Sequence, residues 1–259
     1  MILAGFLLLA VGAVDLVRQF AARRWIGYLV VAVLLLVLGS VGDALLPMLA
    51  ALVTGALWVW CMPDDRPSPA GFWPAVLLGI VSVGAVVTLP ERSDAGLIGE
   101  VWHLDSPVGT ISFDLAVLVV GAAAFLLESA NLVVRAALDG EHTWRPIERR
   151  GLDANVADAE RVDGESSVSE PTAAIDRRSA FQGGRLIGPL ERILVLMLTL
   201  AAAYPLLAAM LAAKGIVRFP EISRGRETGA RAEYFLVGSL VSWVIALGAA
   251  FLVWWSANG

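Results

Sequence analysis

Charged residues are scarce in this sequence, because only 17% of its 259 residues are Asp, Glu, Lys or Arg, whereas 58% are hydrophobic. A soluble domain of ordinary composition is about half apolar and about one quarter charged. The mean hydropathy of +0.75 departs from that composition in the same direction. The shortage of charge excludes an ordinary soluble domain and predicts an integral membrane protein.

Cysteine, histidine and the common catalytic motifs are also scarce. Cys61 is the single cysteine, so the chain cannot form an internal disulfide and nothing in it requires an oxidising compartment. The two histidines, His103 and His142, lie in different connections and have no Cys or His neighbours at metal-ligand spacing. No P-loop, dinucleotide-binding fingerprint or G-x-S-x-G motif occurs either. We therefore predict no metal site and no cofactor, assign no catalytic residue, and favour a protein that is not an enzyme.

A basic stripe of the kind that binds nucleic acid is missing as well. The formal net charge is -5, and the basic residues are interspersed with acidic ones. Nucleic-acid binding needs Lys and Arg clustered on one surface. The sequence therefore argues against nucleic acid as a partner and leaves the lipid bilayer as the expected environment.

Long apolar stretches are what the sequence has in abundance. A membrane helix needs about 17 to 25 mostly apolar residues to cross about 30 Å of hydrocarbon. Seven stretches meet or nearly meet this length: residues 2–20, 25–42, 45–62, 72–89, 111–134, 190–213 and 234–255. Most tryptophans, Trp58 and Trp243 among them, lie at or near the ends of these stretches, where the indole ring favours the headgroup layer. The predicted fold class is all-α, a polytopic transmembrane bundle of about seven helices.

One long polar segment interrupts the apolar pattern. Residues 136–185 are rich in Asp, Glu, Arg, Ser, Gly and Pro and show no apolar periodicity. Such a segment cannot bury enough apolar surface to offset the entropy lost on ordering. The sequence therefore predicts a five-helix block over 1–135, a disordered hydrophilic linker over 136–185, and a two-helix block over 186–259.

Basic residues near the helix ends predict the orientation, because connections rich in Lys and Arg stay in the cytoplasm. The first connection carries Arg18, Arg23 and Arg24, and the linker carries arginines at both of its ends. With seven spans, these positions place the N-terminus outside and both the linker and the C-terminus in the cytoplasm.

The last connection conflicts with that orientation. It carries five basic residues, namely Lys214, Arg218, Arg224, Arg226 and Arg231, yet seven continuous spans would place it outside. Either the acidic residues of this short loop make the placement tolerable, or a break near Tyr204 and Pro205 turns the chain back and keeps the connection inside. We favour the first explanation, since later loops obey the rule less strictly than early ones.

The stretch over 111–134 carries the candidate polar face. Glu128, Asn131 and Arg135 are spaced i, i+3 and i+7, and Asp114 lies four turns earlier on nearly the same side. In one interpretation these four residues line the pathway of a transporter or channel. In the other, which we favour, Asp114 and Arg135 mark the two membrane interfaces and Glu128 pairs with Arg135 or with another helix.

Other charges within the apolar stretches are few. Asp15 precedes Arg18 by three residues, which predicts a local ion pair with the Arg18 side chain reaching toward the headgroups. The stretches 25–42, 45–62, 72–89, 190–213 and 234–255 carry no charge in their interiors. Ion-coupled transporters usually need such charges at mid-depth, so this absence argues against coupled transport.

Small residues recur at four-residue spacing in the last two stretches. The pairs are Ala208 with Ala212, Ala209 with Ala213, and Gly238 with Ser242. This spacing lets helix backbones approach closely. We expect these faces to pack together or on a partner.

The C-terminal part reads GRLIGPLERILVLML, then LAAKGIVRFPEI, then AEYFLVGSLVS. This pattern, over about residues 183–245, resembles the C-terminal unit of an uncharacterised bacterial family of polytopic membrane proteins. Many members of that family begin with a short His-Leu-x-Gly-Asp-Phe-x-x-Gln helix, which this sequence lacks. The resemblance implies a bacterial plasma-membrane protein and brings no activity with it.

Five charged residues of this C-terminal unit form a candidate interfacial cluster: Glu191, Arg192, Lys214, Arg218 and Glu233. We favour an ion pair of Glu233 with Lys214 or Arg218 that clamps the last two helices. The alternative is a site for an anion or a lipid headgroup made by Lys214, Arg218 and Arg224.

Three functions remain open at this point. The leading one is a non-enzymatic membrane scaffold that binds a membrane-protein partner or a second copy of the chain. The alternative is a transporter or channel that uses the polar face, and a membrane enzyme is third. A water-filled cavity beside that face would favour transport, whereas an exposed Gly and Ala face would favour the scaffold.

Overall fold

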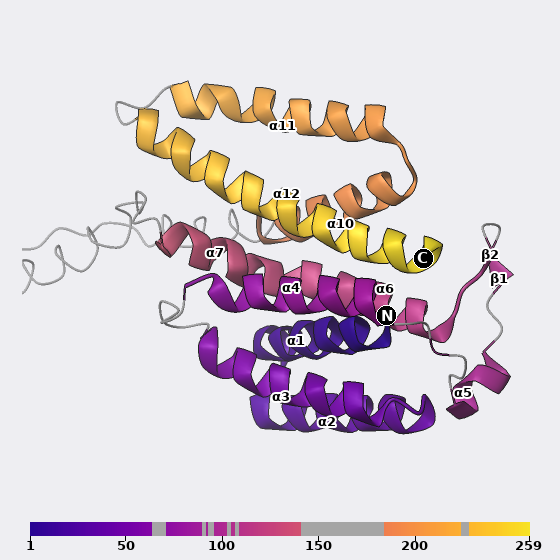
Figure 1. Cartoon of the computed structure of the whole chain (residues 1–259). Helices are drawn as coiled ribbons and strands as arrows, with labels where there is room; N and C mark the ends of the chain where they lie inside the picture. The colour runs from indigo at the N-terminus through magenta and orange to yellow at the C-terminus, as the bar shows by residue number, and fades with distance from the viewer. Residues whose placement is uncertain are drawn as a thin grey trace, which may run out of the picture.

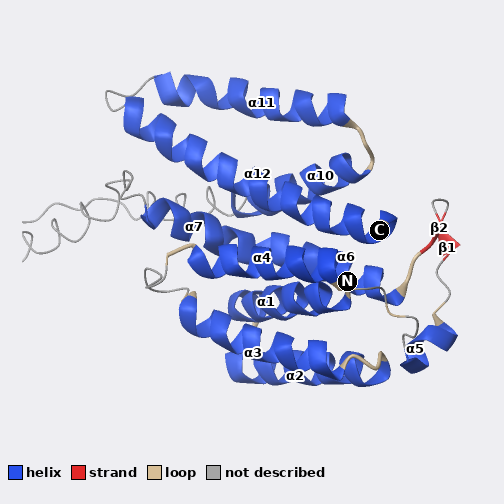
Figure 2. Ribbon diagram, in the orientation of Figure 1, coloured by secondary structure: helices blue, strands red, loops and turns tan. Residues whose placement is uncertain are grey.

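The computed structural model describes residues 1–63, 71–89, 92, 96–102, 105–106, 109–140, 184–223 and 228–259. Within these ranges, side chains are described except at 99–101, 105–106, 109–110, 139–140, 184–185, 217–223 and 228–234. Almost all of the described chain is helical, with one short β-hairpin (Figure 1 and Figure 2). The predicted all-α bundle is confirmed.

The described chain consists of helices and one pair of short strands. In chain order they are α1 (Ile2–Phe20), α2 (Arg24–Val41), α3 (Leu45–Cys61), α4 (Trp73–Thr88), α5 (Gly96–Val101), α6 (Phe113–Ala124), the π-helical turn η1 (Phe125–Ser129), α7 (Ala130–Gly140), α10 (Gly184–Leu200), α11 (Tyr204–Ser223) and α12 (Thr228–Asn258). The strands β1 (Asp105–Ser106) and β2 (Gly109–Thr110) pair antiparallel. Helix α6, η1 and α7 form one uninterrupted rod.

Four described helices are long and apolar enough to cross a membrane. They are Ile2–Phe20, Arg24–Val41, Phe113–Leu138 and Phe235–Asn258. Three shorter apolar helices accompany them, Leu45–Cys61, Trp73–Thr88 and Tyr204–Ile216. This set of helices fits a membrane-embedded protein. The predicted linker falls mostly on residues 141–183, which lie outside the described part of the chain.

Helix α1 is the centre of the bundle, where it packs on α6, α3, η1, α2 and α4. Glycines allow the closest of these contacts. A Cβ at Gly12 would lie 2.6 Å from the backbone nitrogen of Phe125, and one at Gly5 would lie 2.9 Å from that of Leu118. The sequence separation between Gly12 and Phe125 equals that between Gly5 and Leu118. Because both contacts keep the same offset, α1 and the α6–η1 rod run parallel without a shift in register.

Local signals explain where the α6 rod begins. The hydroxyl of Ser112 accepts a hydrogen bond from the backbone N–H of Leu115 at 3.3 Å, which caps the helix. Asp114 lies in the first turn, where the helix dipole favours a negative charge.

The predicted single span over 190–213 is wrong, because the chain breaks in the middle of it. Helix α10 ends at Leu200, and α11 begins at Tyr204. Ala202 between them adopts a left-handed conformation, with φ of 52°. Figure 1 shows α11 turning back along the bundle after this break. The C-terminal block therefore holds three helices, not two, and the break near Tyr204 that we had ranked second is present.

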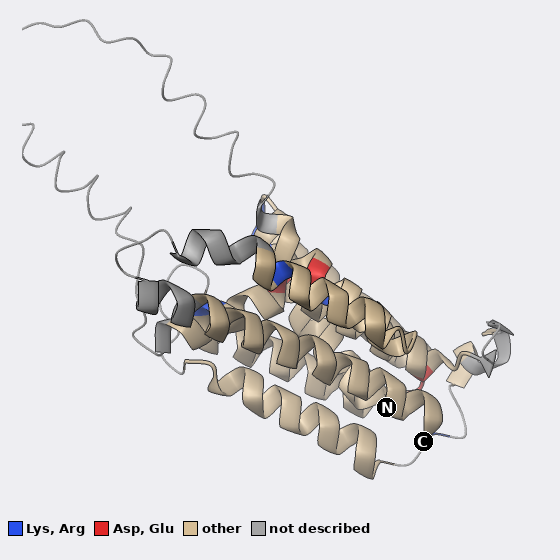
Figure 3. Cartoon of the chain, turned by 90° about the horizontal axis from the view of Figure 1, so that it is seen from above, with Lys and Arg blue, Asp and Glu red and all other residues tan. Residues whose placement is uncertain are grey.

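The extra reversal also changes where the termini lie. Met1 and the C-terminal end lie toward the same end of the bundle, as both Figure 1 and Figure 3 show. The ends of α3, α7 and α11 lie at the opposite end (Figure 1). Seven continuous spans would instead have placed the two termini at opposite ends of the bundle.

Candidate functional site

A buried polar network centres on the π-helical turn of the α6–α7 rod. In this wider turn the backbone N–H of Ala130 bonds the carbonyl of Phe125, five residues back, and this leaves the carbonyl of Leu126 available. Arg192 of α10 donates to the Leu126 carbonyl from Nη1 at 2.8 Å. The irregular turn is thus stabilised by a side chain from the C-terminal block.

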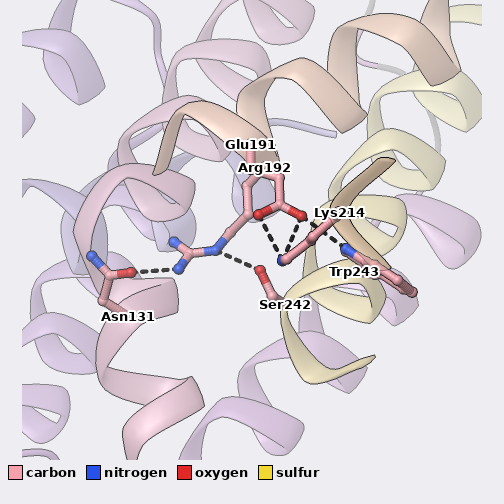
Figure 4. A network of polar contacts seen from close by, with 6 residues as sticks. All are labelled: Asn131, Glu191, Arg192, Lys214, Ser242 and Trp243. Carbon is pink, nitrogen blue, oxygen red and sulfur yellow. Dashed lines mark hydrogen bonds and ion pairs between the residues drawn. The ribbon is translucent and has the colours of Figure 1, made fainter. Parts of the chain in front are cut away.

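Arg192 joins three elements through its guanidinium group. Its Nε donates to the hydroxyl of Ser242 in α12 at 3.0 Å, and its Nη2 donates to the side-chain oxygen of Asn131 in α7. Only 3% of the residue is exposed. Gly188 leaves room for the group, since a Cβ there would lie 3.2 Å from Nη2. Figure 4 shows Arg192 between Asn131 and Ser242.

Two residues of the predicted polar face belong to this network. The side-chain nitrogen of Asn131 donates to Glu128 Oε2 at 3.3 Å and to the Leu127 carbonyl at 3.4 Å. Glu128 is 7% exposed, so its carboxylate lies well inside the bundle. Asn131 therefore links an acidic residue to Arg192 and bonds a second carbonyl of the π-helical turn.

The neighbouring residue, Glu191, holds a separate ion pair. Lys214 Nζ of α11 donates to both carboxylate oxygens of Glu191, at 2.6 and 2.7 Å, and Trp243 Nε1 of α12 donates to one of them at 3.1 Å. Lys214 Nζ also lies 5.8 Å from the ring centre of Phe235 and 5.6 Å from that of Trp243. Figure 4 shows this pair beside Arg192.

The remaining residues of the predicted face and cluster lie elsewhere. Asp114 pairs with Arg92 at 3.2 Å, and the rise of an α-helix places it about 21 Å along the rod from Glu128. Arg135 is exposed, whereas Glu128 is buried. The four residues of the predicted polar face therefore do not form one continuous surface. The side chains of Arg218 and Glu233 lie outside the described residues, and Lys214 pairs with Glu191.

A second buried network ties α1 to the end of α3. Arg18 donates to Asp15 at 3.1 Å, to the Met62 carbonyl at 2.7 Å and to the Val59 carbonyl at 2.7 Å. Trp58 Nε1 donates to the other oxygen of Asp15 at 2.8 Å. The predicted local pair is confirmed.

Two details of the sequence prediction are wrong at this site. Arg18 does not reach toward the headgroups, because it is 8% exposed and donates to the carbonyls of Val59 and Met62 at the end of α3. Trp58 is 3% exposed and is therefore not an interfacial tryptophan. The indole N–H of Trp58 donates its hydrogen bond to the buried carboxylate of Asp15, so it does not need a partner in the headgroup layer.

The contacts of Gly5 and Gly12 set the register between α1 and the α6–η1 rod, and this register places the two networks at the same level of the bundle. The offset that brings Gly12 against Phe125 also brings Asp15 level with Glu128 and Arg18 level with Asn131. Two buried acids and two buried bases, Asp15, Glu128, Arg18 and Arg192, thus gather in one polar layer. Figure 3 shows that long stretches of the described helices carry neither Lys or Arg nor Asp or Glu.

The prediction that the 190–213 stretch has no interior charge is wrong. Helix α10 begins at Gly184 and not at 190, so Glu191 and Arg192 lie about two turns inside it. Lys214 lies in the middle of α11 for the same reason, since that helix continues to Ser223. The G-x-L-E-R pattern around Gly188 was the sequence signal that could have drawn attention to this pair.

The arrangement shows no metal centre in the part of the chain that is described, since no group of three or more His, Cys, Asp or Glu residues gathers there. No protein-family model, no curated protein and no solved structure matches the chain. The resemblance of residues 183–245 to a bacterial membrane-protein family therefore stays a prediction.

Proposed function

We propose that this protein is a non-enzymatic membrane scaffold that presents α11 to a transmembrane helix of a partner or of a second copy. The proposal rests on how α11 sits at the edge of the bundle. Its inward side chains recur at i, i+3, i+4 and i+7 and are half-buried: Leu207, Met210, Leu211 and Lys214. Its alanines on the other side are all exposed: Ala208, Ala209, Ala212 and Ala213.

An exposed alanine face has a specific use in a membrane. Lipid tails are as apolar as Leu or Ile, so apolarity alone does not draw two helices together. Small side chains let two backbones approach closely and gain van der Waals contact. The expected small-residue face is thus present and open to a partner, as the scaffold hypothesis requires.

The buried networks support the same function. Each nitrogen of the Arg192 guanidinium donates to a protein group, and both oxygens of Glu191 accept from Lys214. Buried polar groups that satisfy one another need no ligand to complete them. We assign the Arg192 network to joining α10 and α12 to the α6–α7 rod, and the Glu191 pair to joining α10, α11 and α12.

We also propose an orientation in the bacterial plasma membrane. The break after Leu200 brings the connection after α11 to the end of the bundle where α3 and α7 end (Figure 1). By sequence, Arg224 and Arg226 follow α11 and the arginines of the linker follow α7, so the positive-inside rule assigns both connections to the cytoplasm. This side is the cytoplasmic one in our proposal, and both termini face outside.

Site-specific photocrosslinking in intact membranes tests the scaffold function. A photoreactive amino acid at Ala212 is expected to give a discrete protein adduct, and the same amino acid at Ile80, exposed on α4, only lipid adducts. The substitution Ala208→Leu should abolish the Ala212 adduct, because a bulky side chain on the same face prevents close approach. The adduct mass separates a second copy from another protein. Only lipid adducts at both positions would refute the proposal.

Thiol accessibility in intact cells tests the orientation. A Cys61→Ser chain with one cysteine at Arg226 should be protected from an impermeant reagent, and one with a cysteine at Gly259 should react. Labelling at position 226 with protection at 259 would reverse the proposed orientation.

Transport is the second candidate function, and the polar layer is the observation that favours it. Glu128 and Asp15 are buried carboxylates on apolar helices, and ionisable groups at such depth often mark ion pathways. Proton or ion flux in vesicles that contain the purified protein, lost in Glu128→Gln while the fold is kept, would favour transport over the scaffold.

A further inference from the structure

We infer that the turn between α1 and α2, over residues 21–24, binds the headgroup of an anionic phospholipid through the guanidinium groups of Arg23 and Arg24. This surface is separate from the alanine face of α11, and its lipid would bind whether or not α11 has a partner. Two exposed arginines, exposed aromatic rings beside them and a fixed backbone support the site.

The two arginines of the turn differ from the other arginines of the bundle. Arg18, Arg92 and Arg192 each donate to carboxylate or carbonyl oxygens of the protein. Arg23 and Arg24 are exposed, and within the described part of the chain neither guanidinium group has a hydrogen-bond or ion-pair partner. A guanidinium group presents five N–H donors in a fork that fits the oxygens of a phosphate. This donor capacity is thus available to a group from outside the protein.

Large aromatic residues lie on both sides of the two arginines. Phe20 is 73% exposed and Trp25 is 67% exposed. Trp60 is exposed at the same end of the bundle, because the hydrogen bonds of Arg18 join α1 to the end of α3 (Figure 1). Exposed indole rings on a membrane protein favour the headgroup layer. The arginines therefore lie at the level of the lipid phosphates.

The backbone of the turn is held on both sides. The N–H of Ala21 donates to the Val17 carbonyl at 2.9 Å where α1 ends, and the N–H of Gly27 donates to the Arg23 carbonyl at 3.3 Å where α2 begins. A Cβ at Gly27 would lie 2.3 Å from Val17 Cγ1, so the two helices are in close contact next to the turn. A bound headgroup would therefore order only the arginine side chains and not the backbone.

The opposite end of the bundle has aromatic rings but no such arginines among its described residues. Trp254 and Trp255 are exposed near the end of α12. Arg92, the described basic residue at that end, pairs with Asp114 and donates to the carbonyl of Gly42. Within the described chain, exposed aromatic rings and unpaired arginines therefore flank one another at the α1–α2 turn and not at the other end.

Charge and position together select an anionic lipid. Each basic residue close to an anionic membrane surface strengthens binding about fivefold. A zwitterionic headgroup carries a cation of its own and therefore competes less well for the two arginines. A free phosphate would gain nothing from the exposed rings of Phe20 and Trp25, whereas a lipid places its acyl chains beside them.

Photocrosslinking of the full chain in vesicles tests the site. A photoreactive amino acid replaces Ala22, which is exposed in the turn, or Leu46, which is exposed at the start of α3 at the opposite end of the bundle. The vesicles contain phosphatidylcholine with a minor share of phosphatidylglycerol in both leaflets, so the orientation of the inserted chain does not affect the result. The mass of each adduct identifies its headgroup.

The expected enrichment is local to the turn. The ratio of phosphatidylglycerol to phosphatidylcholine adducts at Ala22 should exceed the ratio in the vesicle, and the ratio at Leu46 should match the vesicle. Arg23→Gln or Arg24→Gln should each lower the Ala22 ratio about fivefold. The matched control that replaces both arginines with Lys keeps the two charges and should keep the enrichment.

Three results would overturn the lipid site. They are an Ala22 ratio equal to that of the vesicle, an enrichment that survives when both arginines are replaced with Gln, and an equal enrichment at Leu46. The last would show that anionic lipid gathers around the whole protein. Both arginines are exposed, so the glutamine variants should fold, and an unchanged circular dichroism spectrum verifies this.

Discussion

Helices α1 and α11 have apolar sequences, yet one is enclosed by the bundle and the other covers its edge. In α1, 72% of an 18-residue stretch, long enough to cross a membrane, is buried, and five other elements surround the helix. Over residues 204–216, whose side chains are described, helix α11 packs one face on α10 and α12 and leaves its alanines exposed. The difference shows that apolarity places a helix in a membrane, whereas small residues and charges decide its place in the bundle.

The same residue types serve opposite purposes in the two helices. Gly12 of α1 is in tight backbone contact with Phe125, whereas a Cβ at Gly215 of α11 would meet nothing within 4 Å. Arg18 of α1 has a side chain that is 5% exposed and bonds fixed backbone carbonyls, whereas the Lys214 side chain is 24% exposed. Comparable substitutions in the two helices should therefore change the free energy of unfolding by different amounts.

The largest effect is expected from Arg18→Met. The change removes the cation from the buried Asp15 carboxylate, and it removes the hydrogen bonds that Arg18 donates to the carbonyls of Val59 and Met62. Removing one partner of a buried ion pair typically costs about 3 to 5 kcal/mol. SDS titration in mixed micelles, followed by circular dichroism, measures the loss.

The control for this substitution is Arg135→Met, because Arg135 is exposed on α7. Its free energy of unfolding should change by less than about 0.5 kcal/mol. Equal losses in the two variants would mean that the buried network of α1 adds nothing to stability.

An intermediate effect is expected from Gly12→Ala. The added Cβ would lie 2.6 Å from backbone atoms of Ala124 and Phe125, so the two helices must separate. Overpacking of this kind costs about 1 to 3 kcal/mol. The matched change Gly215→Ala on α11 meets no atom and should be neutral or slightly stabilising, since Ala favours a helix by about 1 kcal/mol. The same titration compares them, and a similar loss in both would contradict the packing difference.

The smallest effect on stability is expected from Lys214→Met. The ion pair that it removes is partly exposed, and such pairs contribute about 1 kcal/mol or less. Unfolding in SDS should therefore be almost unchanged. A loss as large as that of Arg18→Met would show that the Lys214 pair is part of the fixed core.

Local patterns in the sequence predicted some parts of the site. The spacing of Asp15 and Arg18 was enough to predict their ion pair, since residues three apart on a helix are neighbours. The shared face of Glu128 and Asn131 was likewise readable, and the two side chains are hydrogen-bonded. Their partner Arg192 was not, because it lies 61 residues away from Asn131 across the polar segment.

The apolar stretches of the sequence were enough to determine that the chain is an all-helical bundle fit for a membrane. Hydropathy and helical periodicity depend only on residues that are neighbours in the chain. The break at Ala201–Ala203 does not lower the hydropathy of the stretch, since alanine is as apolar in a turn as in a helix. The sequence offered a break near Tyr204 and Pro205 as one of two alternatives, and the tertiary structure decided between them. The tertiary structure alone decided the burial of Arg18 and Arg192 and the exposure of the alanine face on α11. The burial and the exposure depend on contacts between helices that are separated in the chain, and no local pattern contains them.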